Sequence, residues 1–344
     1  MSEETTRRSV GLSRRELLQT AAATAAGTAT AAAAQGEHPA MDGKLKVGCL
    51  SWCFHNFAGG VDPAEAIDVI GGMGFDGVEL IANAPADLHT LWSGESLDRI
   101  RARVEKNKLQ VSQFVLFQQA VPGLASPDQR VRARSIDAFE AGCAAAARLG
   151  APIVNIVAPW PADYGAERGY LPRYYEIGAP KAGERFHIGL PGDFDWPKAW
   201  ATFVETVREC LRRAAAHDVK MTIEHHTHCL VHDATAFLML WDAVRDERLG
   251  YNLDSGWTLL QREYPPLAIH KVGRRLMNVH MRDIDGPMRR FPAFGTGVMD
   301  VPAIVAACKK VGFTGFLSIE QDKNVEDMRE TCRRYLRIMR EAIG

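Results

Sequence analysis

The sequence predicts an α/β protein built as a single closed (β/α)₈ barrel, the TIM-barrel architecture. From residue 45 onward, short apolar runs of strand character alternate with amphipathic helical patterns. Near-continuous apolar runs are typical of parallel strands that are covered on both faces. Eight such β/α units between residues 45 and 344 match the number and length that a closed barrel requires.

The apolar runs place the eight strands. The helices between them keep one apolar stripe each, with three-and-four spacing, for example in residues 200–214 and 328–339. The predicted strands are Lys46–Phe54, Phe75–Ala82, Gln110–Phe117, Ile153–Pro159, Lys220–His226, Gly250–Asp254, Leu276–Asp283 and Gly315–Gln321.

Local signals mark where the helices begin and end. Helix starts carry a capping residue followed by proline, at Asp62-Pro63, Ser126-Pro127 and Asp300-Val301-Pro302. Glycines predict helix ends before strands, at Gly74, Gly150 and Gly312. An open doubly wound sheet is disfavoured, because its glycine-rich phosphate loop is replaced by Leu50–Phe54 after the first strand.

The first 34 residues have the features of an export signal. Ser13–Leu18 resembles the twin-arginine signature, Thr20–Ala34 is nearly all Ala and Thr, and Ala32–Ala34 offers small residues for cleavage. The alternative is an Ala-rich helical tail. We therefore predict a twin-arginine signal peptide over residues 1–34, recognition by the twin-arginine export machinery, and a periplasmic location. The tract is too short and too poor in Leu and Ile to span a membrane.

Charge and cysteine usage exclude several classes of protein. The formal net charge of −1 gives no electrostatic basis for binding nucleic acid or an anionic membrane. The seven cysteines are dispersed and lack metal-site spacing. An odd, dispersed set predicts buried free thiols rather than a disulfide framework.

Four predicted strands end in a side chain that can bind a metal ion. In a (β/α)₈ barrel, catalytic groups come from the carboxyl ends of the strands, so these four side chains are expected to meet there. A buried acid is costly unless it is paired or bound to a metal. The predicted ligands, called here the ligand quartet, are Glu224, Asp254, His280 and Glu320.

A small polar residue stands two positions before each member of the quartet. Side chains two residues apart on a strand point the same way, and a barrel interior is normally filled by Val, Ile and Leu. We therefore predict that these residues orient the ligands by hydrogen bonds. They are Thr222, Asn252, Asn278 and Ser318.

Three carboxylates and one imidazole form a mostly hard donor set. Such a set suits Mn²⁺, Mg²⁺, Co²⁺ or Fe²⁺ in octahedral geometry, with two positions left for water or substrate oxygens. Zn²⁺ also binds carboxylates, although its sites usually contain more nitrogen and sulfur donors.

The quartet resembles the Glu…Asp…His…Glu pattern of the xylose-isomerase-like superfamily of sugar isomerases and epimerases. Its spacings of 30, 26 and 40 residues are similar to those of ketose 3-epimerases and hydroxypyruvate isomerases. Supporting phrases are Gly74–Glu79, His280–Asp283, Phe294–Gly297 and Gly312–Glu320. The resemblance extends from about Lys46 to Ile343, and it implies a metal-binding barrel that acts on a small carbohydrate.

The chain departs from the ketose epimerases at three positions. Trp257 replaces the His three residues after the Asp ligand, and Gly286 replaces the Arg six residues after the His ligand. The Lys common two residues after the His ligand is Arg282 here. The missing His and Arg normally hold substrate oxygens in that group, so the departures weaken the case for 3-epimerisation of a free ketose.

Several side chains are candidate substrate contacts, because sugar faces stack on aromatic rings. The connection Pro159–Pro197 is long enough to be functional and contributes Trp160, Tyr164, Tyr170, Tyr174 and Tyr175. A phosphate site formed by Gly295–Gly297 with Arg289 and Arg290 is a weaker hypothesis. Glu79 is expected either in a buried pair or in the pocket. The predicted substrate contacts are His226, Trp257, Arg282, Trp160, Trp52 and Glu79.

The quartet predicts proton-transfer chemistry. A divalent metal acidifies the hydrogen beside a sugar carbonyl, and Glu224 and Glu320 would exchange protons with that carbon through an enediolate. The sequence thus predicts a metal-dependent sugar isomerase or epimerase. Two alternatives stay open. The same groups would serve a lyase, dehydratase or keto-glycoside-cleaving enzyme, and the barrel would also suit a non-catalytic periplasmic sugar- or metal-binding protein.

Overall fold

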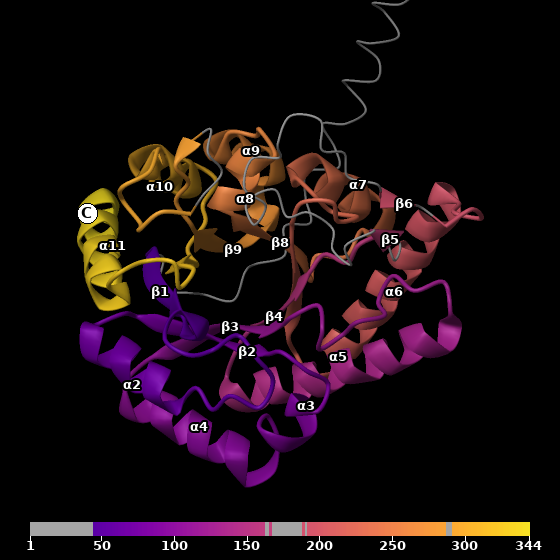
Figure 1. The fold of residues 1–344 in the computed structure, drawn as a ribbon, viewed down its shortest axis with the longest axis horizontal. Helices are drawn as coiled ribbons and strands as arrows, with labels where there is room; N and C mark the ends of the chain where they lie inside the picture. The colour runs from indigo at the N-terminus through magenta and orange to yellow at the C-terminus, as the bar shows by residue number, and fades with distance from the viewer. Residues whose placement is uncertain (1–43, 162–164, 167–187, 190, 287–290) are drawn as a thin grey trace, which may run out of the picture. The chain divides into compact units, whose positions relative to one another are not determined.

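The computed structural model describes residues 44–161, 165–166, 188–189, 191–286 and 291–344. Within these residues, eight parallel strands close into a barrel in the order β1-β10-β9-β8-β7-β4-β3-β2, with helices between successive strands (Figure 1). The predicted (β/α)₈ barrel is confirmed. The predicted signal segment lies outside the described residues, as do Tyr164, Tyr170, Tyr174, Tyr175, Arg289 and Arg290.

All eight predicted strands are present. They are β1 (Lys46–Leu50), β2 (Gly77–Ala82), β3 (Gln110–Leu116), β4 (Ile153–Val157), β7 (Lys220–Glu224), β8 (Leu249–Asp254), β9 (Leu276–Met281) and β10 (Phe316–Ile319). The first was predicted to reach Phe54, but Ser51–Cys53 forms the short 3₁₀ helix η1. The η1 residues are buried, so apolar character continues beyond the last ladder hydrogen bond and hides the end of the strand.

The helices alternate with these strands around the barrel. They are α2 (Ala64–Met73), α3 (Asp87–Thr90), α4 (Gly94–Lys106), α5 (Gln129–Leu149), α6 (Trp196–Ala216), α7 (Ala234–Val244), α8 (Ser255–Leu260), α9 (Pro265–Val272), the 3₁₀ helix η2 (Gly273–Arg275), α10 (Val301–Lys310) and α11 (Met328–Ile343). Gly74 and Gly150 end α2 and α5 in the left-handed conformation, as predicted. The long connection also contains a two-stranded antiparallel pair that was not predicted, formed by β5 (Gly165–Ala166) and β6 (Ile188–Gly189).

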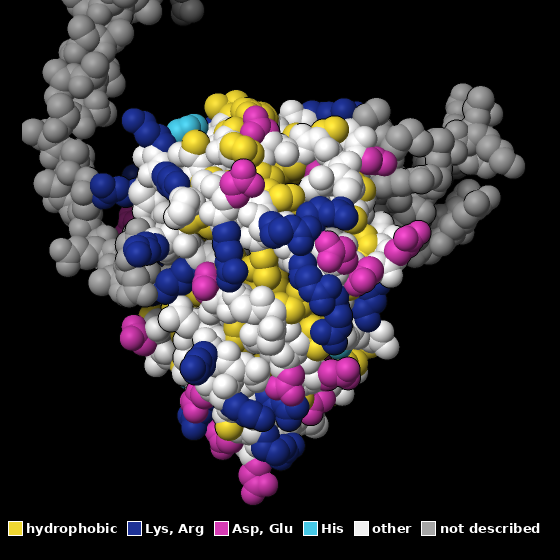
Figure 2. Space-filling view, turned by 90° about the vertical axis from the view of Figure 1, so that its left-hand side faces the viewer, with side chains coloured by type: hydrophobic (Ala, Val, Ile, Leu, Met, Phe, Trp, Pro, Cys, Tyr) yellow, Lys and Arg dark blue, Asp and Glu magenta, His cyan; other side chains and the backbone are white. Residues whose placement is uncertain are grey.

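Side chains of the hydrophobic core fill the space between the strands and the helices. Gly142 of α5, for example, allows that helix to approach β3, because a Cβ there would lie 2.6 Å from the side chain of Leu116. All seven cysteines are buried and free, which confirms the prediction. Among the described residues, none of the helices has the length and apolar character needed to cross a membrane. On the face drawn in Figure 2, basic and acidic side chains lie interspersed.

The strand register brings the predicted functional residues side by side. Asp254 at the end of β8 pairs with His280 on β9, and His280 pairs with Ser318 on β10. Glu224 at the end of β7 pairs with Asn252 on β8. Because the strands are parallel, their carboxyl ends open on the same side of the barrel, where a site can form.

Candidate metal centre and active site

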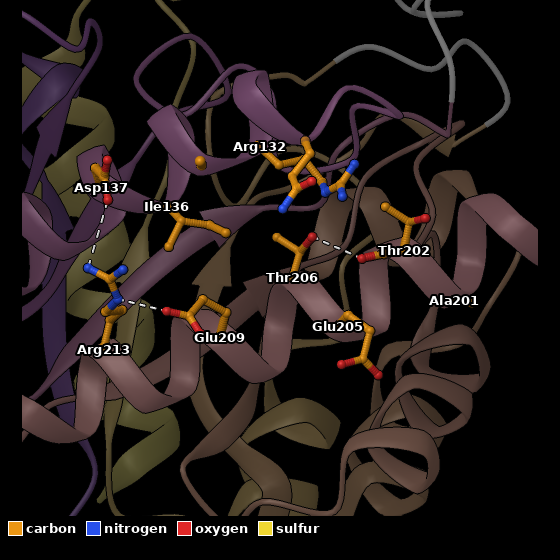
Figure 3. A pocket seen from close by; sticks show the side chains of 11 residues that line it. Arg132, Ile136, Asp137, Ala201, Thr202, Glu205, Thr206, Glu209 and Arg213 are labelled. Carbon is orange, nitrogen blue, oxygen red and sulfur yellow. Dashed lines mark hydrogen bonds and ion pairs between the residues drawn. The ribbon is translucent and has the colours of Figure 1, made fainter.

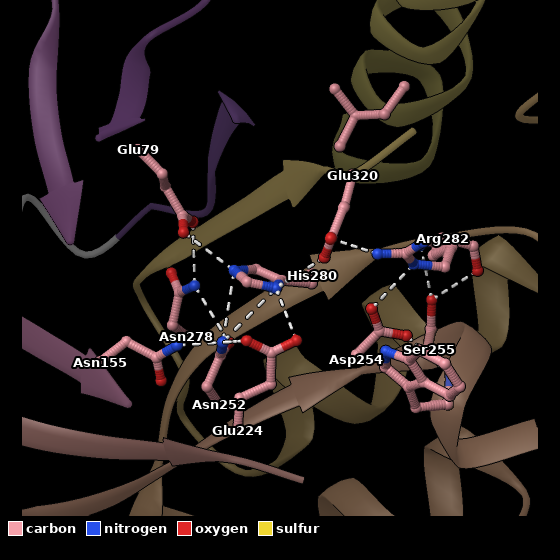
Figure 4. A network of polar contacts seen from close by, with 12 residues as sticks. Glu79, Asn155, Glu224, Asn252, Asp254, Ser255, Asn278, His280, Arg282 and Glu320 are labelled. Carbon is pink, nitrogen blue, oxygen red and sulfur yellow. Dashed lines mark hydrogen bonds and ion pairs between the residues drawn. The ribbon is translucent and has the colours of Figure 1, made fainter. Parts of the chain in front are cut away.

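The ligand quartet converges at the carboxyl ends of β7, β8, β9 and β10 (Figure 4). One ligand atom from each of its four residues lies within 4.8 Å of the other three. Oxygens held about 2.1 Å from one ion in octahedral geometry stand roughly 3–4 Å apart. The observed cluster is therefore close to the size that a single divalent ion requires.

Carboxylates lie on both sides of the His280 ring, and the amide nitrogens of Gln113 and Asn252 lie 3.2 Å from its Nε2. Nε2 lies 2.8 Å from Oε2 of Glu79, while Nδ1 lies 3.3 Å from Oε1 of Glu224 and 3.0 Å from Oε2 of Glu320. Burial acts to lower the pKa of His280, but the charges of Glu79 and Glu224 outweigh burial and raise the pKa well above its ordinary value. A proton or a cation must therefore stand between Nδ1 and the two glutamates.

The carboxylates of the quartet carry more negative charge than their surroundings neutralise. Burial raises the pKa of Asp254 to about 7; Arg282 opposes this shift, and the charges of Glu320 and Glu224 reinforce it. Burial also acts to raise the pKa of Glu320, but the charges of Arg282 and His280 hold it well below its ordinary value. Oε2 of Glu320 is buried and makes no well-aligned hydrogen bond among the described residues, although Nδ1 of His280 lies 3.0 Å away. This donor set, with its carboxylate oxygens turned toward an imidazole nitrogen, fits a divalent cation.

Arg282 bridges two members of the quartet. Its Nε lies 3.1 Å from Oδ2 of Asp254, and its guanidinium also forms an ion pair with Glu320 (Figure 4). A third ion pair joins it to Asp322 at 2.8 Å, and the ring of Phe291 lies under the guanidinium at 4.5 Å. The residue was predicted as a substrate contact, which stays a prediction; its side chain is only 5% exposed and pairs with two of the ligand carboxylates.

Three of the four predicted orienting residues form one hydrogen-bonded layer beneath the quartet. Nδ2 of Asn252 lies 3.4 Å from Oε2 of Glu224, and Nδ2 of Asn278 donates to Oδ1 of Asn252 at 3.1 Å. Thr222 donates within the same layer to side chains of β3 and β4. These contacts fix the position of the Glu224 carboxylate from below.

Ser318 does not join this layer. Its Oγ is buried without a hydrogen-bond partner among the described residues. The neighbouring strand offers no polar side chain there, because Gly48 of β1 stands opposite and a Cβ at that position would lie 2.3 Å from Oγ.

The layer contains two residues that the sequence reasoning missed. Gln113 of β3 accepts a hydrogen bond from Thr222 at 3.0 Å and donates to Glu79 at 2.9 Å. Asn155 of β4 donates to Oε2 of Glu224 at 3.1 Å. Asn155 is the one polar residue of β4, a signal that was available in the sequence. Gln113 follows Gln110 and Ser112 on β3, so nothing in the strand pattern singled it out.

Aromatic rings lie beside the quartet. The ring of Trp52 stands edge-on to His280, with centroids 6.5 Å apart. The rings of His226 and Trp257 are in contact at 3.7 Å, and the backbone N–H of Trp257 donates to Oδ1 of Asp254 at 2.7 Å. Trp160 packs partly buried against the hydrophobic core. Trp257 is itself only 2% exposed, so it lines the site from within rather than from the surface.

The structure also shows the surroundings of two other predicted features, Glu79 and the loop Gly295–Gly297. The Glu79 carboxylate occupies the first of its two expected settings, a fully buried pair with His280. The amides of Gly295 and Gly297 do not form a phosphate cradle, because both donate to the Asp283 carboxylate at 2.9 Å. These two amides are therefore already satisfied by a buried acid of the same chain and give the phosphate hypothesis no support.

A groove of about 510 Å³ lies elsewhere, between α5 and α6 on the outside of the barrel (Figure 3). Polar side chains such as Arg132, Asp137, Glu205 and Arg213 line it, and Arg213 pairs with Glu209 at 2.8 Å. None of the quartet lines this groove, so it is separate from the candidate centre.

Comparison with known proteins identifies the family. Residues 67–339 match the family described as xylose isomerase-like TIM barrel. The chain belongs to the xylose isomerase-like TIM barrel family. Among curated proteins, it is 23% identical over 142 residues to the rhizopine catabolism protein MocC of Rhizobium meliloti; the match covers 36% of this chain and 43% of that protein.

Solved structures share the fold of this xylose isomerase-like barrel. D-psicose 3-epimerase of Clostridium cellulolyticum H10 superposes with a TM-score of 0.67 at 16% identity, covering 87% of this chain and 99% of that one. The 3-keto-D-glucoside 4-epimerase YcjR of E. coli superposes with a TM-score of 0.63 at 16% identity, covering 87% and 100%. At such low identity the similarity establishes the fold alone.

Proposed function

We propose that this protein is a divalent-metal-dependent sugar isomerase or epimerase. The observation that carries the proposal is the convergence of the ligand quartet at the mouth of a xylose isomerase-like barrel. In the proposal, Glu224, Asp254, His280 and Glu320 hold one Mn²⁺, Mg²⁺, Co²⁺ or Fe²⁺ ion. When bound, such an ion polarises a carbonyl and acidifies the hydrogen on the neighbouring carbon.

The chain supplies two carboxylates to move that proton. Glu224 is held through Oε2 by the amides of Asn155 and Asn252, which leaves Oε1 facing the centre. Glu320 is held through Oε1 by Arg282, which leaves Oε2 facing the same centre. Each glutamate therefore presents one fixed oxygen that can accept or return a proton.

The strand order places these two glutamates on different sides of the site. In the barrel, β7 and β10 are separated by β8 and β9. Proton removal by one glutamate and return by the other inverts a carbon centre, which is epimerisation. Return of the proton to the neighbouring carbon moves the carbonyl, which is isomerisation.

A second candidate reaction is elimination from the same enediolate, as in a lyase, a dehydratase or a keto-glycoside-cleaving enzyme. The observation that favours it is Trp257, which is buried against His226 at a position where ketose epimerases have a substrate-binding His. Proton spectra of products from ketoses, aldoses and 3-keto-glycosides distinguish the reactions. An inverted centre, a moved carbonyl or a new alkene identifies epimerase, isomerase or lyase, and no product from any sugar supports a binding protein.

Metal affinity is expected to fall by at least about tenfold for each pH unit below about 7. The reason is that Asp254, with its pKa raised to about 7, must lose its proton before it can bind a cation. Above this pH the Asp254 carboxylate is ionised, but His280, whose pKa is raised well above its ordinary value, must still release a proton, so the affinity keeps rising with pH. Calorimetric titration with Mn²⁺ between pH 5.5 and 8, in two buffers of different ionisation enthalpy, measures both the affinity and the proton release. An affinity that stays constant across this range contradicts the assignment of Asp254 as a ligand.

We also propose export through the twin-arginine pathway, on the strength of the paired arginines and the Ala-rich tract of residues 1–34. Replacing Arg14 and Arg15 together by Lys is expected to leave an unprocessed precursor in the cytoplasm. Cell fractionation with immunoblotting measures this outcome, and the matched control is Arg7→Lys with Arg8→Lys, which lies outside the motif. Normal processing of the Arg14/Arg15 variant would refute the proposed pathway.

A further inference from the structure

Glu79 is a fully buried carboxylate that the proposed proton transfer does not use. It stands on β2, and its partner His280 stands on β9, with β1 and β10 between them in the barrel order. The contact between the two side chains therefore crosses the barrel interior (Figure 4). An ionised acid in such a place is costly unless donors surround it.

Three side-chain donors meet the Glu79 carboxylate. Oε2 lies 2.8 Å from Nε2 of His280 and accepts from Nε2 of Gln113 at 2.9 Å. Oε1 accepts from Nδ2 of Asn278 at 2.9 Å. Thr222 donates to Oε1 of Gln113 at 3.0 Å, which orients that amide with its N–H groups toward Glu79. The carboxylate is thus an acceptor in every one of these contacts.

This arrangement determines which nitrogen of His280 carries the proton. The amide nitrogens of Gln113 and Asn252 also lie 3.2 Å from Nε2 of His280, but its shortest contact is to Oε2 of Glu79 at 2.8 Å. Because an ionised carboxylate can only accept a hydrogen bond, Nε2 is the donor in that contact. Nδ1 then presents its lone pair once a cation displaces its proton. Nδ1 faces Oε1 of Glu224 at 3.3 Å and Oε2 of Glu320 at 3.0 Å. Three lone pairs then converge on one point, which is the electronic arrangement of a metal site.

We propose that Glu79 is a positioning residue that locks His280 in the Nε2–H tautomer with Nδ1 directed at the proposed cation. The inference rests on the proposed function, because it assigns a role within the same metal centre. Glu79 acts through His280 and is not a member of the ligand quartet. Removing its charge would free the imidazole to rotate or to change tautomer, and the affinity of the centre would fall.

The test compares two buried carboxylates changed to amides. Glu79→Gln preserves volume but leaves one oxygen to accept from three donors. Asp87→Asn is the matched control, because Asp87 is 4% exposed and, within the described part of the chain, its carboxylate accepts from the backbone N–H groups of Gly60, Asn83 and Ala84. Titration with Mn²⁺ is expected to show a loss of affinity of about 10–100-fold in Glu79→Gln and no change in Asp87→Asn.

Two further readouts separate positioning from a purely structural or a substrate-binding role. Nitrogen-15 spectra of the Mg²⁺-loaded wild type are expected to show His280 protonated at Nε2, and this signature is expected to be lost in Glu79→Gln. Saturating Mn²⁺ is expected to restore turnover in Glu79→Gln. A residue that contacted substrate would leave turnover low at any metal concentration, and that result would overturn the inference.

Failure of Glu79→Gln to fold, unchanged Mn²⁺ affinity and a wild type that binds no ion each lead to a definite conclusion about Glu79. If Glu79→Gln does not fold, Glu79→Asp retains the charge and withdraws the oxygens from Nε2, so its Mn²⁺ affinity is expected to fall less but in the same direction. Unchanged affinity in the folded variant, with wild type binding Mn²⁺ normally, overturns this inference and leaves the proposed function standing. A wild-type protein that binds no divalent ion overturns both.

Discussion

Removal of the divalent metal by a chelator is expected to abolish turnover and to lower the melting temperature. The physical reason is electrostatic repulsion, since the centre buries the carboxylates of Glu224, Asp254 and Glu79, and the charges of Glu320 and Glu224 act on Asp254. A ligand present at 100 times its Kd stabilises the folded state by about 2.7 kcal/mol. Scanning calorimetry with and without chelator measures the shift, and a sugar-conversion assay measures the loss of turnover.

Two controls accompany the chelation experiment. Adding back Mn²⁺ is expected to restore both the melting temperature and turnover. The double variant Asp254→Asn with Glu320→Gln lacks two ligands, so its melting temperature is expected to be insensitive to chelator. Full turnover after the metal has been removed would rule out a metal-dependent reaction.

The substitution Glu224→Gln is also expected to have a large effect, which is a loss of turnover. The amide keeps the shape of the side chain but cannot accept a proton, and a positioned general base contributes about 10²–10⁴-fold. Turnover measured at saturating Mn²⁺ is expected to fall by at least that factor, because saturation compensates for weaker metal binding. The matched control is Glu205→Gln on the outer groove (Figure 3), which is expected to retain wild-type turnover. Full activity in Glu224→Gln would show that this glutamate does not transfer the proton.

The fold and the ligand quartet were predictable because both depend on patterns along single strands. An apolar run that ends in an acid or a histidine indicates a strand with a functional carboxyl end, and barrel closure then brings such ends together. Glu224, Asp254 and His280 each terminate or nearly terminate a strand, as predicted. The predicted strand ends were less accurate where buried residues continue beyond the last hydrogen bond between the strands, as at Ser51–Cys53.

The cross-barrel contacts were not predictable, because they depend on which side chains face each other after closure. The contact between Glu79 and His280 joins strands separated by two others. Arg282 was predicted as a substrate contact because it stands where ketose epimerases carry a Lys, and its ion pairs with Asp254 and Glu320 are visible only in three dimensions. Gly297 likewise suggested an anion site until the structure showed that its amide binds Asp283.

Deuterium incorporation tests the central claim most directly, because isomerisation, epimerisation and elimination all begin by removing a proton beside a carbonyl. The metal-loaded wild type is incubated in deuterated water with a panel of ketoses, aldoses and 3-keto-glycosides, and a chelated sample is run in parallel. We expect at least one sugar to gain deuterium at a single carbon beside its carbonyl, or to release a leaving group, only when the metal is present. A protein that carries its metal but exchanges no proton with any of these sugars would contradict the account.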